Sequence, residues 1–453
     1  AGDWDGIIMS HAGFQRLPVA SDTEADYRDR ELATLRGHLA ANQDNPHLRS
    51  TVKRIERKLL AAEEKMKRLL ATGTRDPGLT FEAVGIDYVF YDEAHACKNL
   101  ATASNIPGAA VDGSGRASDL AMKLDYLRQS GRARIATLAT ATPIANSITE
   151  AHVMLRYTAP DLLATSGTQA FDDWAATFGT VTTDLELSIE GGGRYRPKTR
   201  LSRFANVPEM LRMMHHVADI RTEADLNLPI PAIAARPDGQ PGPHTVLVAS
   251  NPALDGYISQ LGERADAVRG GAVDPADDNL LKISTDARKA ALDVRLVTPD
   301  AESVPSKISV AADHIADLWQ QHRHTIYPDP ITGDPHPTTG ALQLVFCDLG
   351  TPRADGVFDA YHQLRDELVA RGVPSQAVAF IHDAATPVAK ARLFAQARCG
   401  DIAVLIGSTE KMGVGTNVQH RLAALHHLDA PWRPADVSQR NGRILRQGNR
   451  NPA

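Results

Sequence analysis

The sequence predicts an α/β protein built on parallel sheets. Several apolar runs have the β-branched and aromatic composition of buried parallel strands, and each passes directly into polar residues. Ligands of open α/β sheets bind at the carboxyl ends of the strands, so these polar residues are the first candidates for a functional site. The runs lie within residues 87–95, 342–348 and 403–409.

Two adjacent carboxylates follow the first run. Residues 87–95 read Asp-Tyr-Val-Phe-Tyr-Asp-Glu-Ala-His, which places Asp92 and Glu93 at the end of the strand. One carboxylate there can hold Mg²⁺ through its water shell, and the other can position or deprotonate a water that attacks a γ-phosphate. Acidic residues are also common in turns and at helix N-caps, so this pair predicts a nucleotide site only in combination with other motifs.

An arginine-rich segment lies near the other end of the chain. Residues 439–448 read Gln-Arg-Asn-Gly-Arg-Ile-Leu-Arg-Gln-Gly, and a helix would place Arg440, Arg443 and Arg446 along one flank. Arginine suits phosphate binding because its charge is permanent and its planar fork can bind two oxygens. The alternative is a solvated basic helix end.

Hydroxyl-bearing and glycine residues follow two further strand-like runs. Thr140 and Thr142 lie in Leu-Ala-Thr-Ala-Thr-Pro-Ile-Ala-Asn-Ser at 138–147, and Ser408 and Thr409 end the run that begins at residue 403. The glycines at 413 and 415 allow close backbone approach to a ligand. A Thr-rich strand end can equally be a cap, and a glycine pair can equally be a turn.

Taken in order, these segments resemble the motifs of superfamily 2 helicases. Residues 92–95 resemble the Walker B or DEAH box, and 138–147, 342–348, 403–419 and 439–448 resemble motifs III, IV, V and VI. The spacing of motif VI, its approach through 428–432, and 171–178 resemble the Swi/Snf-like branch of double-strand DNA translocases. Within that branch, the chain resembles the helicase halves of large bacterial, plasmid and phage proteins with an adenine-methyltransferase segment upstream.

This resemblance implies two RecA-like lobes that use ATP and Mg²⁺ to move along DNA, which is expected to be double-stranded and bound without sequence preference. Asp92 would hold Mg²⁺ through water, and Thr140 and Thr142 would couple the acidic site to the other lobe. The implied catalytic residues are Asp92, Glu93, His95, Arg443 and Arg446. The implied cofactor-binding residues are Gly415, Gln439 and Arg440, and the implied DNA-backbone contacts are Ser408, Thr409 and Asn417.

One departure from the helicase pattern changes the expectation for this chain. A phosphate-binding Gly-x-x-x-x-Gly-Lys-Ser/Thr loop should precede the acidic box, yet the sequence contains no Gly-Lys pair. The segment from Trp4 to His11 resembles the short strand of motif Ib, so we expect an incomplete first lobe, truncated at its N-terminus, whose phosphate loop comes from an upstream segment or a partner. The alternative is a catalytically silent nucleic-acid or protein-binding module of a larger DNA-modification or anti-restriction assembly.

The predicted domains are a partial first lobe at 1–158, a mainly helical intervening region at 159–305 and a second lobe at 306–453. An antiparallel helical hairpin is expected as an insertion at about 22–72, since apolar residues between Leu48 and Leu69 alternate spacings of four and three, the pattern of a heptad seam. The preceding segment has Leu32, Leu35 and Leu39 at similar spacing, and Asn45-Pro46 separates the two.

Positive charge is concentrated locally although the chain has a net charge of −6. Residues 47–72 carry eight Lys or Arg against three Glu, and residues 194–212 carry six against one. Local clusters set phosphate affinity, so Lys198, Arg200 and Arg203 are predicted DNA contacts. They could equally flank an exposed turn.

Composition places the chain among ordinary globular proteins, with 43% hydrophobic and 23% charged residues. No apolar run reaches the roughly 18 residues that a membrane span needs. Cys97, Cys347 and Cys399 are few and widely spaced, which favours a reducing compartment over a disulfide framework. We therefore expect a cytoplasmic protein with no membrane partner.

Overall fold

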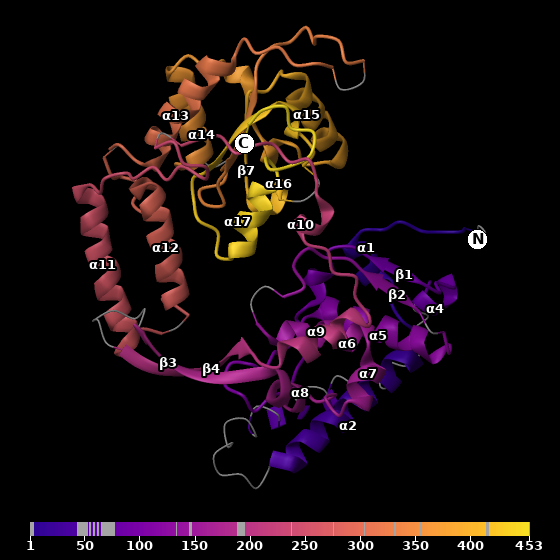
Figure 1. The fold of residues 1–453 in the computed structure, drawn as a ribbon. Helices are drawn as coiled ribbons and strands as arrows, with labels where there is room; N and C mark the ends of the chain where they lie inside the picture. The colour runs from indigo at the N-terminus through magenta and orange to yellow at the C-terminus, as the bar shows by residue number, and fades with distance from the viewer. Residues whose placement is uncertain are drawn as a thin grey trace. The chain divides into compact units, whose positions relative to one another are not determined.

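The computed structural model confirms an α/β protein with parallel sheets and many helices, an architecture compatible with RecA-like lobes (Figure 1). It describes residues 4–42, 53, 56–57, 59–60, 63–64, 78–132, 134–144, 147–187, 195–236, 238–274, 276–302, 304–329, 332–353, 356–413 and 416–452. The chain divides into two compact units. Unit 1 is 1–186 with 195–220, and unit 2 is 187–194 with 221–453.

Unit 1 contains a parallel strand pair, β1 (Val89–Tyr91) and β2 (Ala136–Leu138). The connection between them includes the 3₁₀ turn η2 (Ala94–Cys97) and helix α5 (Gly115–Gln129), which is a β-helix-β crossover of the kind that parallel pairing requires. Helix α5 begins at the N-cap Ser114, whose hydroxyl accepts from the amide of Ala117. Its apolar face packs into a core that includes both strands.

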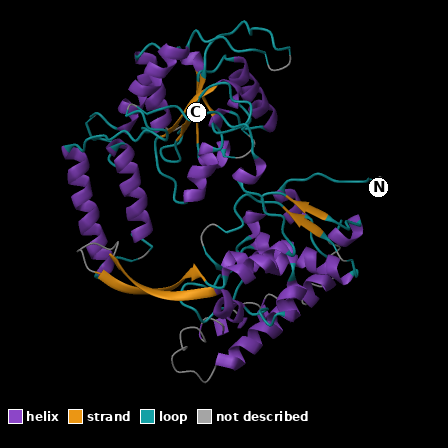
Figure 2. Ribbon diagram, in the orientation of Figure 1, coloured by secondary structure: helices purple, strands orange, loops and turns teal. Residues whose placement is uncertain are grey.

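Further helices complete unit 1, and a second apolar core forms around the fully buried Trp174. Strands β3 (Gly179–Leu187) and β4 (Tyr195–Phe204) make a separate two-stranded sheet, which Figure 2 shows as two long, curved strands side by side. The helices are α1 (His11–Arg16), α2 (Ser21–Asn42), α4 (Phe81–Val84), α6 (Thr149–Thr158), α7 (Pro160–Thr165), α8 (Phe171–Phe178) and α9 (Val207–His215).

Unit 2 is built on a four-stranded parallel sheet in the order β6-β7-β5-β8. The strands are β5 (Leu342–Phe346), β6 (Val378–Phe380), β7 (Val404–Gly407) and β8 (Leu422–His427). Every residue of β5 is buried, as expected for a central parallel strand that is covered on both faces. The apolar sequences within 342–348 and 403–409 therefore correctly predicted buried strands.

Helices cover both faces of this sheet. Helices α13 (Lys307–His322) and α14 (Ala360–Ala370) pack with Val345 on one face, while α15 (Pro387–Cys399) and α16 (Thr409–Met412) pack with Leu344 and Phe346 on the other. The remaining helices are α10 (Glu223–Leu226), α11 (Pro252–Arg269), α12 (Leu280–Leu292) and α17 (Pro434–Asn441). Short 3₁₀ turns are η3 (Val294–Leu296), η4 (Ser375–Ala377), η5 (Ile381–Asp383) and η6 (Gln419–Arg421).

The predicted helical hairpin is described in part. Helix α2 confirms a helix in its first arm, with Leu32 buried, and Arg36 pairs with Glu63 across 2.9 Å, as an antiparallel second arm would allow. Most of the heptad seam between Leu48 and Leu69 lies outside the described residues.

Two local predictions differ from the structure. The segment from Trp4 to His11 is not a strand, because residues 4–10 form an exposed loop with no strand beside them and His11 begins α1. The intervening region also contains β3 and β4 beside its helices. Residues 180–183 read Thr-Val-Thr-Thr, and such β-branched residues favour a strand. No helix among the described residues is both long and apolar enough to cross a bilayer.

A buried histidine makes the stability of unit 1 depend on pH. His152 is 1% exposed, its ring packs against Phe171 and Trp174, and its Nε2 donates to the carbonyl of Thr168. Nδ1 has no partner among the described residues, so a second proton would be placed on a buried nitrogen without an acceptor. Burial accordingly lowers the pKa of His152 from 6.5 to about 4.

We expect acid to destabilise unit 1 through this residue. Between about pH 6.5 and pH 4 the unfolded chain binds the proton that the folded chain rejects, so stability falls by about 2 kcal/mol from about pH 7.5 to about pH 5. In His152→Gln this fall in stability should be smaller by that amount. The free energy of unfolding would be measured by urea titration at each pH, with unfolding followed by the fluorescence of Trp174. The control is His216→Gln, at an exposed histidine of the same unit. Identical pH profiles for wild type and His152→Gln would contradict the assignment.

Candidate functional site

The carboxyl ends of β1 and β2 form a polar edge in unit 1. Because the strands are parallel, the residues after Tyr91 and after Leu138 emerge at the same edge. The amide of Ala94 donates to the carbonyl of Ala139, and the amide of Ala139 donates to the carbonyl of Tyr91, both at 2.9 Å. These bonds hold the acidic segment and the threonine segment together.

The acidic box has an unusual backbone. Glu93 has φ 50° and ψ 46°, in the left-handed region that non-glycine residues rarely adopt. Its amide donates to Asp92 Oδ1 at 2.9 Å, and its Oε2 lies 3.1 Å from Nδ1 of His95. Asp92 is exposed, so its carboxylate is accessible to a hydrated cation.

Thr140 connects the second strand end to the acidic box. Its Oγ1 lies 3.4 Å from Nδ1 of His95 and accepts from the amide of Thr142 at 3.1 Å. The structure thus brings together Asp92, Glu93, His95, Thr140 and Thr142 at one sheet edge. Among the described residues, no group of three or more Asp, Glu, His or Cys side chains could hold a metal ion directly.

His11 also reaches this edge, and no sequence pattern pointed to it. Its Nε2 lies 2.9 Å from the carbonyl of Asp92, to which it donates, and its ring stacks on Tyr91 with 4.6 Å between ring centres. It precedes Asp92 by 81 residues, so only the fold brings the two together.

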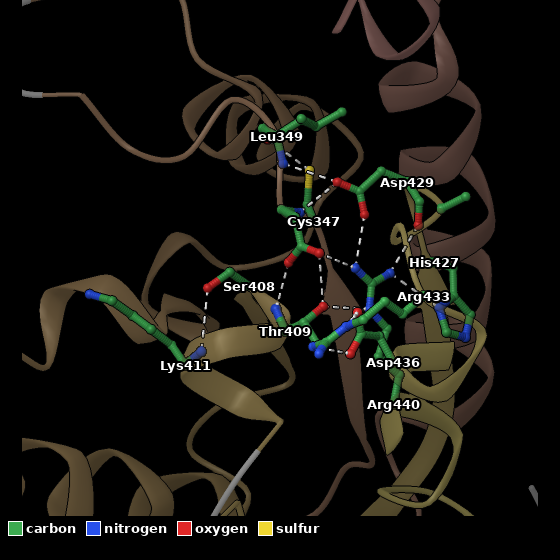
Figure 3. Close-up of polar contacts among 12 residues, drawn as sticks. Cys347, Leu349, Ser408, Thr409, Lys411, His427, Asp429, Arg433, Asp436 and Arg440 are labelled. Carbon is green, nitrogen blue, oxygen red and sulfur yellow. Dashed lines mark hydrogen bonds and ion pairs between the residues drawn. The ribbon is translucent and has the colours of Figure 1, made fainter. Parts of the chain in front are cut away.

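A second polar edge lies at the carboxyl ends of the strands of unit 2 (Figure 3). Asp348 follows β5, Thr409 follows β7 and Asp429 follows β8. The amide and hydroxyl of Thr409 donate to the carboxylate of Asp348 at 2.6 and 2.9 Å. Ser408 is the N-cap of α16, and its hydroxyl accepts from the amide of Lys411.

Arg440 lies at the centre of this edge. It is fully buried and forms ion pairs with Asp348 at 2.7 Å and with Asp429 at 3.0 Å. Sequence reasoning missed both acidic partners as site residues. A sequence signal was available, because each is the acidic residue two positions after a strand, Asp348 after β5 and Asp429 after β8.

The other two arginines contact the loop after β7. Arg443 donates to the carbonyls of Gly413 and Thr416, and Arg446 donates to the carbonyl of Thr416 at 3.4 Å. A Cβ at Gly413 would lie 2.3 Å from the carbonyl of Thr409 and 3.2 Å from the side-chain oxygen of Gln439, so this position needs glycine. Gly415 lies outside the described residues.

The remaining predicted DNA contacts are spread over both units. Asn417 is exposed after the same loop of unit 2, and its carbonyl accepts from Arg398 at 3.2 Å. In unit 1, Arg200 and Arg203 are exposed on β4, and Lys198 belongs to the same strand. Hydroxyl contacts between β3 and β4 join Thr182 to Ser202 and Thr183 to Thr199.

Comparison with known proteins points to helicases and to an anti-restriction protein. Residues 1–222 match the family model of a probable helicase domain. A protein named Defense against restriction protein B, from Escherichia phage P1, is 27% identical over 236 residues, which cover 49% of this chain and 10% of the relative. The chain therefore carries a helicase-related domain and is similar to a small part of an anti-restriction protein.

Proposed function

We propose that this chain is the motor segment of an ATP-dependent DNA helicase or translocase of the Swi/Snf-like type. The observation that carries the proposal is the placement of the helicase-like motifs, which occur in family order at the carboxyl edges of two parallel sheets. ATP hydrolysis would drive stepwise movement along DNA. A cytoplasmic location belongs to the same proposal.

In unit 1, Asp92 would hold Mg²⁺ through its water shell and Glu93 would position the attacking water. The exposure of Asp92 and the left-handed backbone of Glu93 support these assignments, since strained backbone persists where the surrounding structure enforces it and is concentrated at functional sites. His95 and Thr140 would couple the acidic box to the segment after β2, because their contact joins the two strand ends.

In unit 2, Arg443 and Arg446 would stabilise the charge that develops on the γ-phosphate. Both side chains contact neutral carbonyls of the loop after β7. Phosphate oxygens form stronger, charge-assisted hydrogen bonds with guanidinium than carbonyls do, so a nucleotide could displace these contacts. Gln439 and the glycines at 413 and 415 would complete the nucleotide-binding surface, and Ser408 and Asn417 would lie along the DNA backbone. The hydroxyl of Thr409, which was also expected to contact DNA, is instead bonded to Asp348 and Arg440 within unit 2.

The sequence contains no Gly-Lys pair, so the lysine and amides that bind the β- and γ-phosphates would come from an upstream segment or a partner.

A second candidate function follows from the similarity to Defense against restriction protein B. In that case the chain would be a catalytically silent nucleic-acid or protein-binding module of an anti-restriction or DNA-modification assembly.

We expect the chain alone to hydrolyse ATP at or near the background rate, with or without duplex DNA. Without the lysine and amides of a phosphate loop, both nucleotide binding and transition-state stabilisation should be weak. The measurement is phosphate release, with Asp92→Asn and Glu93→Gln as reference variants. Robust DNA-stimulated release that either substitution abolishes would mean that another segment of this chain replaces the loop.

In the complete ATPase, which also contains the phosphate loop, Arg443→Ala or Arg446→Ala should lower kcat by about 10³-fold or more. DNA affinity and melting temperature should change little, because the contacts of both arginines to carbonyls are partly exposed. Arg443→Lys is the matched control for charge, since it keeps a cation but loses the planar fork. A fall in melting temperature with normal turnover per folded molecule would assign both arginines to the fold instead.

Duplex DNA should bind this chain without sequence preference and with strong salt dependence. Replacing Lys198, Arg200 and Arg203 together by Ala should reduce the slope of log affinity against log salt by about two to three if all of them contact phosphates. The control replaces Arg30, Arg132 and Arg212, exposed arginines of unit 1 that each pair with a carboxylate.

Arg200 and Arg203 are three residues apart on β4 and therefore lie on opposite faces of the strand. The two single variants thus identify the face that contacts DNA. An unchanged slope in the triple variant would remove β4 from the binding surface. No duplex binding at low salt would contradict the translocase proposal.

A further inference from the structure

The guanidinium of Arg440 uses all its hydrogen-bonding capacity inside unit 2. Nε donates to Thr409 Oγ1 at 2.8 Å, and Nη2 donates to Asp348 Oδ2 at 2.7 Å and to Asp429 Oδ1 at 3.0 Å. Nη1 donates to the carbonyl of Asp429 at 2.9 Å and to Nδ1 of His427 at 3.3 Å. A guanidinium has five N–H donors, and each has an acceptor here.

The acceptors are themselves held in place. Oδ2 of Asp429 accepts from the amides of Asp348 and Leu349 at 2.6 and 3.0 Å. The Thr409 hydroxyl accepts from Arg440 and donates to Asp348, so its single proton is also committed. With Nε2 of His427 donating to Asn441 Oδ1 at 2.9 Å, Nδ1 of that ring is the acceptor for Arg440.

Burial makes this network expensive to break. Arg440 is 0% exposed, its guanidinium carbon lies 5.2 Å from the ring centre of Phe346, and the side chain of Asp429 is 4% exposed. Removing one partner of a buried ion pair leaves an uncompensated charge, whereas the intact network satisfies every donor. A nucleotide phosphate could bind Arg440 only if the ion pairs of Arg440 with Asp348 and Asp429 were broken.

We propose that Arg440 is a positioning residue, which fixes helix α17 to the loop after β7, and not a ligand of the nucleotide. The Arg440 network (Asp348, Thr409, His427, Asp429 and Arg440) connects the ends of β5, β7 and β8 to α17. Arg443 and Arg446 lie three and six residues after Arg440 and contact carbonyls after helix α16, which begins at Thr409. The network therefore sets where these two arginines lie relative to that loop.

The role in turnover rests on the proposed ATPase function, but the coupling itself does not. We would measure hydrogen exchange of residues 409–412 and 434–446 in this chain for Thr409→Val, which removes the hydroxyl at nearly constant volume. Both segments should exchange faster together, by about tenfold or more, because they share one network. Thr409→Ser keeps the hydroxyl and should exchange like wild type.

A matched control uses another arginine at the start of α17. Arg433 pairs with Asp436 at 2.8 Å, is 46% exposed and lies outside the network. Arg433→Gln should leave exchange of residues 409–412 unchanged, since exposed ion pairs contribute little. If Thr409→Val does not fold, Asp348→Asn, which keeps the shape but removes one charge, gives the same test. Unchanged exchange in either folded network variant would overturn the proposal, whatever the ATPase activity.

The kinetic measurement distinguishes positioning from ligand binding. In the complete ATPase, Thr409→Val should lower kcat by about 10- to 100-fold with little change in the KM for ATP, because misplaced arginines act on the transition state. Thr409→Ser should restore kcat. A raised KM with unchanged kcat in Arg440→Lys would overturn the proposal in favour of a nucleotide ligand. Absence of ATPase activity in the wild-type complete protein would contradict the proposed function, and the exchange experiment would still decide the coupling.

Discussion

Parallel strand pairing is the constraint on which both units depend. A parallel neighbour requires a crossover connection, so each strand is followed by a loop at one edge of the sheet and then by a helix on its face. In unit 1 this brings Asp92 and Thr140 to a common edge. In unit 2 it brings Asp348, Thr409 and Asp429 together although up to 81 residues separate them. The topology of each parallel sheet therefore brings together side chains that are far apart in the sequence.

The two edges are organised in opposite ways. In unit 1 the acidic groups are presented to solvent, with Asp92 exposed and Glu93 held in a left-handed conformation. In unit 2 the carboxylates of Asp348 and Asp429 pair with the buried guanidinium of Arg440, and the partly exposed Arg443 and Arg446 come after it in the chain. The first edge therefore leaves a carboxylate accessible to solvent, and the second holds a buried arginine in a fixed arrangement.

The sequence predicted those parts of the structure that depend on local composition. The runs at 342–348 and 403–409 are buried strands because β-branched and apolar residues fill both faces of a parallel sheet. Although Asp348 and Asp429 could be located after strands, local composition does not show which distant residues pair. The contact of His11 with Asp92, and of Arg440 with Asp348, depends on how the strands are ordered, which residue spacing does not encode. The prediction of a strand at 4–11 was wrong because an apolar run becomes a strand only when a neighbouring strand pairs with it, and residue spacing does not show that neighbour.

The charge balance at the first edge bears on the proposed nucleotide site. Among the described residues, no Lys or Arg forms an ion pair with Asp92 or Glu93, and the side chain of Glu93 lies beside His95. An acidic edge of this kind repels a nucleotide triphosphate unless Mg²⁺ neutralises part of the charge and a further cation faces the β- and γ-phosphates. The arginines at 443 and 446 act on the transition state in the proposed mechanism and do not replace a ground-state lysine. In the proposed mechanism, nucleotide binding and nucleotide hydrolysis are therefore separable requirements, and the residues assigned to this chain would serve hydrolysis more fully than binding.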